Sequence, residues 1–207
     1  MISWVIFDIG GILVQENTDF ISSQIADKLG IETSVLIQVI GKYYDQAVRG
    51  RKTLFQVYRS AIQVLGLPFD PKDILELHLK LYRNSSTQHD TEIVSLLKRL
   101  KKRYSTACLT NTEPEIVDIC SETGLFDYFD RRYLSTEMGM KKPDAEIYKT
   151  VLSDISCQPN EVLFIDDRKE NIAGGKSVGM EVILYFNSAQ LIRDLPRFCP
   201  SLFPGDE

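Results

Sequence analysis

Carboxylates follow directly after two short apolar segments of the chain. Asp8 comes after the apolar run at 5–7, and the adjacent Asp166 and Asp167 come after the run at 162–165. Apolar runs of this length are typical of strands buried on both faces, and open α/β sheets bind ligands at the carboxyl ends of their strands. Three carboxylates gathered at such an edge would make an all-oxygen site of the kind that Mg²⁺ prefers.

Each acidic segment also has a purely structural interpretation. Asp8 could start a turn, and the Asp166–Asp167 pair could cap a following helix. The glycines at 10 and 11, however, would let the backbone turn sharply after Asp8 and approach a bound group closely. Two adjacent acids also raise each other's pKa unless a cation or hydrogen bonds compensate, which again favours a ligand site.

Two further segments between these acids carry phosphate-binding chemistry. Thr110 and Asn111 end a predicted strand, and a Thr hydroxyl can bind a phosphate oxygen together with the next backbone N–H. Lys142 precedes Pro143, a residue suited to the first position of a helix, so Lys142 should project from a helix N-terminus that attracts anions. Taken singly these residues are ordinary, but the order Asp, Thr, Lys, Asp-Asp at successive element ends is hard to obtain by chance.

In these four segments the sequence resembles the haloacid dehalogenase superfamily, and in particular its phosphatase-like branch with an inserted helical cap. The resemblance covers nearly the whole chain. It implies that Asp8 is the nucleophile, that Thr110 is the phosphate-binding hydroxyl and that Lys142 is the motif lysine. It also implies that Asp166 and Asp167 form the acidic metal motif.

Smaller details of the family pattern fall on other residues. Asn171 matches a polar position often seen downstream of the acidic motif, and Lys141 is the less suitable lysine because it is not next to the proline. Gly10 departs from the pattern, since many family phosphatases carry a general acid–base Asp there. Its backbone carbonyl can reach a metal but cannot transfer a proton, and positioned acid–base groups contribute roughly 10²–10⁴-fold to rate.

The resemblance implies magnesium-dependent hydrolysis of a small phosphorylated metabolite, for instance a sugar phosphate, through an aspartyl-phosphate on Asp8. Thr110, the Asn111 N–H and Lys142 would stabilise the phosphoryl oxygens. The Mg²⁺ ligands would be Asp8, the Gly10 carbonyl and one or both of Asp166 and Asp167.

Three alternatives differ in class. A binding protein could keep the phosphate site and lose turnover, which Gly10 makes conceivable. A haloacid dehalogenase would use the same fold without a metal, but Asp166 and Asp167 would then place needless negative charge beside the nucleophile. A phosphonate C–P hydrolase would need a Schiff-base lysine in the cap, where Lys42 and Lys52 are candidates by location alone.

The pattern of elements predicts an α/β fold with a doubly wound parallel sheet and an inserted α-helical cap. Strands are expected at 3–8, 105–110, 131–135, 161–166 and 181–185, and helices near 91–102, 113–123, 143–154, 169–178 and 188–195. The resemblance further implies that the first strand lies between the second and the fourth. Asp8 and Asp166 would then be neighbours at the topological switch point.

The segment 15–88 interrupts this alternation and is expected to form the cap, leaving 1–14 and 89–207 as the catalytic core. Cap helices are predicted at 18–29, 35–48, 53–65 and 71–82. Between two of them lies a basic loop, and in the resembled family the corresponding stretch often faces the active site. Arg49 and Arg51 in this loop could therefore bind an anionic substrate, although a solvated basic turn is an equally simple interpretation.

Composition limits the remaining possibilities. The chain has 207 residues, 43% of them hydrophobic, and its net charge of −5 and pI near 5.2 argue against nucleic-acid binding. It contains no apolar run of about 18 residues, so no membrane span is expected, and the absence of a leader pattern suggests no signal peptide. Four cysteines without metal-like spacing favour a reducing cytoplasm. His78 is expected on a helix surface, and the sequence does not indicate an oligomeric state.

Overall fold

A five-stranded, wholly parallel sheet forms the centre of the protein in the computed structural model, which describes residues 1–14 and 18–202. The strands are β1 (Trp4–Phe7), β2 (Ser105–Thr110), β3 (Arg131–Leu134), β4 (Val162–Asp166) and β5 (Glu181–Leu184). Their order in the sheet is β3-β2-β1-β4-β5. The five predicted strands and the central place of the first strand are therefore confirmed.

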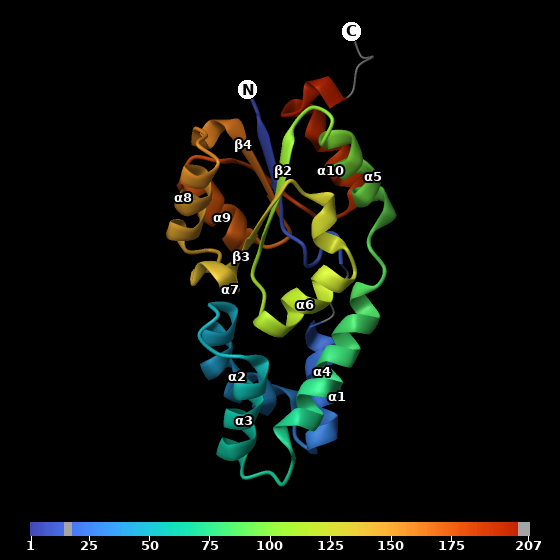
Figure 1. Cartoon of the computed structure of the whole chain (residues 1–207), viewed down its shortest axis with the longest axis vertical. Helices are drawn as coiled ribbons and strands as arrows, with labels where there is room; N and C mark the ends of the chain where they lie inside the picture. The colour runs from blue at the N-terminus through green and yellow to red at the C-terminus, as the bar shows by residue number, and fades with distance from the viewer. Residues whose placement is uncertain (15–17, 203–207) are drawn as a thin grey trace.

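Helices cover both faces of this sheet (Figure 1). They are α5 (Thr91–Leu100), α6 (Pro114–Glu122), α7 (Ser135–Met138), α8 (Ala145–Asp154), α9 (Lys169–Ser177) and α10 (Ser188–Asp194). Because side chains alternate along a strand, Val5 and Phe7 pack toward α5, α6 and α10, whereas Ile6 packs toward α8 and α9. The single-turn α7 was not predicted, since one turn is too short to show a helical period.

Four further helices lie together beyond the carboxyl ends of the strands, at the lower end of Figure 1. They are α1 (Thr18–Leu29), α2 (Thr33–Val48), α3 (Leu54–Leu65) and α4 (Pro71–Ser86). Their termini follow ordinary capping chemistry: Thr53 and Gln56 form a capping box at the start of α3, and Gly66 ends it in the left-handed conformation. The four helices predicted for this segment are confirmed. Residues 15–17, the start of the predicted cap, lie outside the described residues.

The two chain connections between these helices and the sheet run side by side. Val14 and His89 form an isolated antiparallel bridge, and the Asp90 N–H donates to the Leu13 carbonyl at 2.9 Å. The division into a cap at 15–88 and a core on either side of it remains a prediction, and this bridge is the place where such a boundary would fall. None of the described helices is long and apolar enough to cross a membrane.

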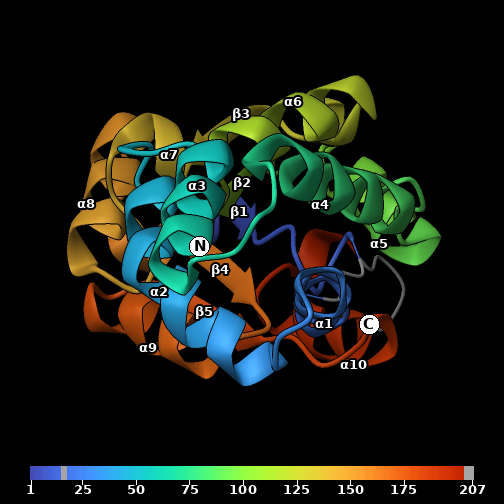
Figure 2. The same ribbon diagram turned by 90° about the horizontal axis from the view of Figure 1, so that it is seen from below.

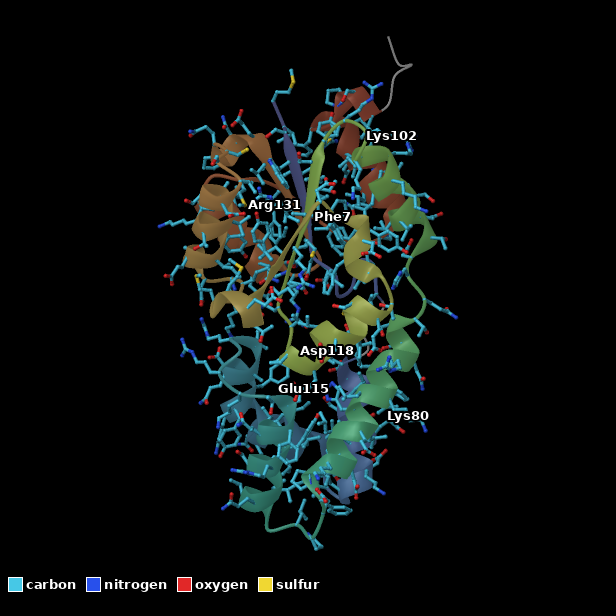
Figure 3. The ribbon with its side chains drawn as sticks, viewed as in Figure 1. Phe7, Lys80, Lys102, Glu115, Asp118 and Arg131 are labelled. Atoms are coloured by element: carbon cyan, nitrogen blue, oxygen red, sulfur yellow. The ribbon has the colours of Figure 1, made fainter. Side chains whose placement is uncertain are left out.

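Several hydrogen bonds hold the four helices against the rest of the protein. Glu115, labelled in Figure 3, reaches from α6 and accepts from the backbone N–H groups of Leu54 and Phe55 at 3.1 and 3.2 Å. The Ser135 hydroxyl donates to the Val48 carbonyl at 2.7 Å. These bonds satisfy backbone groups at a helix start and a helix end that would otherwise lack intrahelical partners.

Candidate active site

The strand register brings the first and last acidic motifs together. Phe7 pairs with Ile165 across β1 and β4, and the Asp8 N–H donates to the Ile165 carbonyl at 2.9 Å. Asp8 therefore lies beside Asp166 at the carboxyl edge of the sheet, as predicted. Both side chains are buried, with Asp8 8% and Asp166 0% exposed.

Lys142 lies between these two carboxylates. Its Nζ is 2.8 Å from Oδ1 of Asp8 and 2.7 Å from Oδ2 of Asp166, and the residue is only 2% exposed. The predicted setting of Lys142 at a helix N-terminus is wrong, because Pro143 precedes the helix and α8 begins only at Ala145. A buried ammonium with two carboxylate partners compensates its own desolvation far better than an isolated one.

Asn111 fixes the backbone of Lys142, a role that sequence reasoning missed. Its Oδ1 accepts from the Lys142 N–H and its Nδ2 donates to the Lys142 carbonyl, both at 2.9 Å. The neighbouring Lys141 points elsewhere and pairs with Asp45 at 2.6 Å. Lys142 is therefore the lysine that faces the carboxylates, and Lys141 is not. The Asn111 side chain positions the Lys142 backbone, in addition to the phosphate contact expected of the Asn111 N–H.

Asp166 is held by a dense set of donors. Arg168 N–H donates to its Oδ1 at 2.8 Å, and Nδ2 of Asn171 lies 3.0 Å from each of its carboxylate oxygens. Asn171 is itself buried, and its carbonyl accepts from the Tyr148 hydroxyl at 2.8 Å. This network fixes the orientation of the Asp166 carboxylate.

Negative charge exceeds positive charge at this edge of the sheet. Burial raises the pKa of Asp8 to about 6, although Lys142 opposes the shift. Burial and the nearby Asp166 also raise the pKa of Asp167. Burial would lower the pKa of Lys142, but Asp8 and Asp166 reverse that effect and keep it raised. The single ammonium of Lys142 therefore compensates only part of the charge of the three carboxylates. A further cation would reduce the remaining repulsion between them.

The three carboxylates are close enough to share that cation. Oxygens of Asp8, Asp166 and Asp167 all lie within 4.8 Å of one another. Gly10 lines the same cavity, and the carboxylate cluster offers a donor set made only of oxygen atoms. Such a set fits a hard divalent cation such as Mg²⁺.

A tight turn at Gly11 completes this arrangement. Gly11 has φ +74°, and a Cβ placed there would overlap the carboxylate of Asp167. The left-handed backbone thus falls on Gly11, where glycine is needed both for the turn and for the space that Asp167 occupies.

These residues form one wall of a cavity of about 430 Å³ between the sheet edge and the cap helices. The wall on the sheet side includes Asp8, Thr110, Asn111, Lys142 and Asp167. Residues of α1 and α2, among them Thr18, Gly41, Tyr44 and Asp45, line the opposite side. The structure therefore brings together all the predicted core-site residues, with Asp166 buried directly behind them.

The predicted basic loop lies where α2 meets the segment that precedes α8. Arg49 pairs with Asp45 at 3.1 Å and with Asp144, the residue just before α8, at 2.7 Å. Neither Arg49 nor Arg51 is among the described residues lining the cavity. A role of these arginines in substrate binding stays a prediction, while the ion pair between Arg49 and Asp144 ties the end of α2 to the start of α8.

Comparison with known proteins agrees with this geometry. A family model described as haloacid dehalogenase-like hydrolase matches residues 2–179. D-ribitol-5-phosphate phosphatase of Bacteroides thetaiotaomicron is 27% identical over 94% of this chain and 97% of that protein. A sesquiterpene phosphatase of Aspergillus oryzae is 28% identical over 84% of this chain and 85% of its own.

Two other matches differ in what they support. Bifunctional epoxide hydrolase 2 of Rattus norvegicus is 34% identical over 50% of this chain, which spans only 20% of that longer protein. A haloacid dehalogenase family enzyme from Bacteroides thetaiotaomicron, solved with magnesium and inorganic phosphate, superposes with a TM-score of 0.73 at 24% identity. That superposition covers 88% of this chain and 93% of the other, and it shows a common fold.

Proposed function

Since the chain belongs to the haloacid dehalogenase-like hydrolases, we propose that it is a magnesium-dependent phosphatase that forms an aspartyl-phosphate on Asp8. The observation that carries the proposal is the cluster of Asp8, Lys142, Asp166 and Asp167 at the floor of one cavity. The substrate would be a small phosphorylated metabolite. The two phosphatase relatives are named for a polyol phosphate and for a sesquiterpene. Their names support a phosphate ester as the substrate but do not indicate which kind of alcohol it carries.

The Asp8 carboxylate is positioned to act as the nucleophile. Its Oδ1 is held by Lys142 and by the Ile9 N–H at 2.7 Å, so we assign the attack on phosphorus to Oδ2. The bond from phosphorus to the ester oxygen breaks, and the leaving group departs as an alkoxide or aryloxide that takes its proton from water. Water then attacks the phosphorus of the acyl phosphate, which releases inorganic phosphate and restores Asp8.

The other residues stabilise charge on the phosphoryl group. Thr110, the Asn111 N–H and Lys142 would donate to its oxygens. When bound by Asp8, the Gly10 carbonyl and the Asp166–Asp167 pair, Mg²⁺ would supply positive charge that reduces repulsion between nucleophile and phosphate. We place this chemistry in a reducing cytoplasm, because the four cysteines of the sequence have no metal-like spacing.

The direct test is turnover of a panel of phosphomonoesters with and without Mg²⁺. We expect phosphate release that stops on chelation and returns when Mg²⁺ is added in excess. Turnover that survives thorough chelation would contradict the metal, and no turnover on any ester would favour a phosphate-binding protein without catalysis. Release of chloride from 2-haloacids would instead indicate a dehalogenase, and release of phosphate from phosphonates would indicate a C–P hydrolase. Lys42 and Lys52 are poorly placed for the C–P hydrolase reaction, because neither lines the described cavity.

Gly10 predicts how the rate depends on the leaving group. Without a carboxylic acid at this position, an alkoxide would leave without a positioned proton donor. We therefore expect the logarithm of kcat/KM to fall steeply as the pKa of the leaving alcohol rises across a series of aryl and alkyl phosphates. The measurement needs conditions where chemistry limits the rate. A nearly flat dependence there would mean that another side chain supplies the proton.

The close approach of Gly11 to Asp167 gives a second prediction. Gly11→Ala should cost about 1–2 kcal/mol of stability from the left-handed backbone, and it should also displace the Asp167 carboxylate. We expect a marked rise in the Mg²⁺ concentration that gives half-maximal activity. Gly30→Ala is the matched control, because Gly30 also has positive φ (+68°) but a Cβ there meets nothing within 4 Å. Equal Mg²⁺ requirements in the two variants would exclude the proposed contact with the metal site.

A further inference from the structure

A second cavity, of about 290 Å³, adjoins the active-site cavity inside the cap. Figure 2, which views the protein from the cap end, shows the helices that surround it, with the strands behind them. Five residues line both cavities: Thr18, Gly41, Tyr44, Asn111 and Arg168. The second cavity therefore lies directly beside the place where the phosphate would bind, and residues of α1, α2 and α4 line it.

Apolar side chains make up most of its wall. Ile21, Ile25 and Leu36 are buried, and Ile37 at the outer end of the wall is 47% exposed. Tyr44, which stands where the two cavities meet, is 37% exposed. Apolar surface left open to water costs about 25 cal/mol per Å², so a hydrocarbon group that covered this wall would bind favourably.

Several polar groups in the cavity are already paired, whereas the Thr112 hydroxyl, which is buried in the same wall, has no hydrogen-bond partner among the described residues. The Tyr58 hydroxyl and Nδ1 of His78 lie 2.6 Å apart, and burial lowers the pKa of His78 to about 4, so this imidazole is neutral at physiological pH. His78 is half-buried and faces Tyr58 on α3, so the expectation that it lies on an open helix surface is wrong. Glu113 is buried beside Tyr44, with which it shares a hydrogen bond. The charged residues Asp19 and Arg168 are exposed at the rim.

We propose that this apolar cavity binds the hydrocarbon part of the substrate, so that the enzyme prefers phosphomonoesters of apolar alcohols over those of polyols. The proposal rests on the proposed function, because the phosphate of the same molecule must reach Asp8. The cavity's volume of about 290 Å³ is close to the lower limit for ordinary small-ligand pockets, which span about 300–1,000 Å³. A polyol would bring several hydroxyl groups against a wall whose surface is mostly apolar, and each hydroxyl that found no partner there would lose its bonds to water.

The test uses a series of para-alkylphenyl phosphates, from phenyl to hexylphenyl phosphate. The para-alkyl group lengthens the apolar part while leaving the pKa of the phenol almost constant, so the series separates binding from leaving-group effects. We expect kcat/KM to rise by about threefold to fourfold for each methylene that enters the cavity, and then to level off when the cavity is full. Turnover that is independent of chain length would overturn the apolar cavity, while leaving the phosphatase function intact.

A pair of variants on α2 locates the effect. Ile37→Asp puts a carboxylate into the wall, and we expect it to lower the ratio of kcat/KM for hexylphenyl over phenyl phosphate by about fivefold or more. Val35→Asp is the matched control, because Val35 is 38% exposed on the same helix but does not line the cavity. An unchanged ratio in Ile37→Asp, or an equal fall in both variants, would contradict the proposal. Absence of turnover on every ester in the series would instead count against the phosphatase function itself.

Discussion

Asp8→Asn should reduce phosphate release to the background of the assay, while the protein keeps its fold. The amide has nearly the shape of the carboxylate but is not a nucleophile, and loss of a covalent nucleophile costs about a million-fold in kcat in a well-studied case. The measurement is steady-state turnover in excess Mg²⁺, with thermal unfolding to show that the variant is folded. Lys142 would still be paired with Asp166 in this variant, so the buried ammonium would not lose all its partners.

Asp118→Asn provides the control for this experiment. Asp118 lies exposed on α6, where Figure 3 labels it, and the substitution makes the same chemical change away from the cavity. We expect its turnover to equal that of the natural sequence. Activity of Asp8→Asn within tenfold of this control, in a preparation free of wild-type protein, would exclude Asp8 as the nucleophile.

Lys142→Met should lose both activity and stability. The substitution leaves Asp8 and Asp166 buried without their counter-charge, and breaking a buried ion pair in this way costs about 3–5 kcal/mol. Loss of a donor to the phosphoryl oxygens should lower kcat by about 10²–10³-fold. Lys141→Met is the matched control, since Lys141 pairs with Asp45 near the surface, where ion pairs contribute about 0–1 kcal/mol.

The pH dependence of this variant has a definite sign. Asp8 already has a raised pKa, about 6, and without Lys142 it should rise further. A raised pKa means that the folded state binds more protons than the unfolded state, so stability falls as pH rises through that range. The loss of stability in Lys142→Met, measured by denaturant unfolding, should therefore shrink as pH falls from about 8 toward about 5. A stability loss no larger than that of Lys141→Met at every pH would contradict the buried charge cluster.

The sequence predicted those parts of the structure that depend on local patterns. The apolar runs predicted the strands. Asp8, Asp166 and Asp167 were predicted as site residues because they directly follow such runs, and the end of a strand is a local feature of the sequence. The position of β1 between β2 and β4 could be predicted only from the family resemblance, since residues 1–14 carry no signal that selects their neighbours in a sheet.

Contacts between distant segments could not be predicted in the same way. Asn111 holds the backbone of Lys142 across 31 positions, and Arg49 meets Asp144 across 95. No period or spacing encodes such pairs, because they arise only when the elements pack. His78 was misplaced for the same reason: a polar residue on a helix looks exposed until the helices around it enclose it.

The most direct test of the account is chemical trapping of the intermediate on Asp8. The protein is mixed with Mg²⁺ and a reactive aryl phosphate, quenched with acid during turnover and reduced with borohydride, which converts an aspartyl-phosphate to homoserine. Mass spectrometry of the N-terminal peptide then locates the change. We predict homoserine at position 8 in the natural sequence, dependent on both Mg²⁺ and substrate, and none in Asp8→Asn. Rapid turnover with an unmodified Asp8, or with the phosphoryl group on a different residue, would contradict the mechanism.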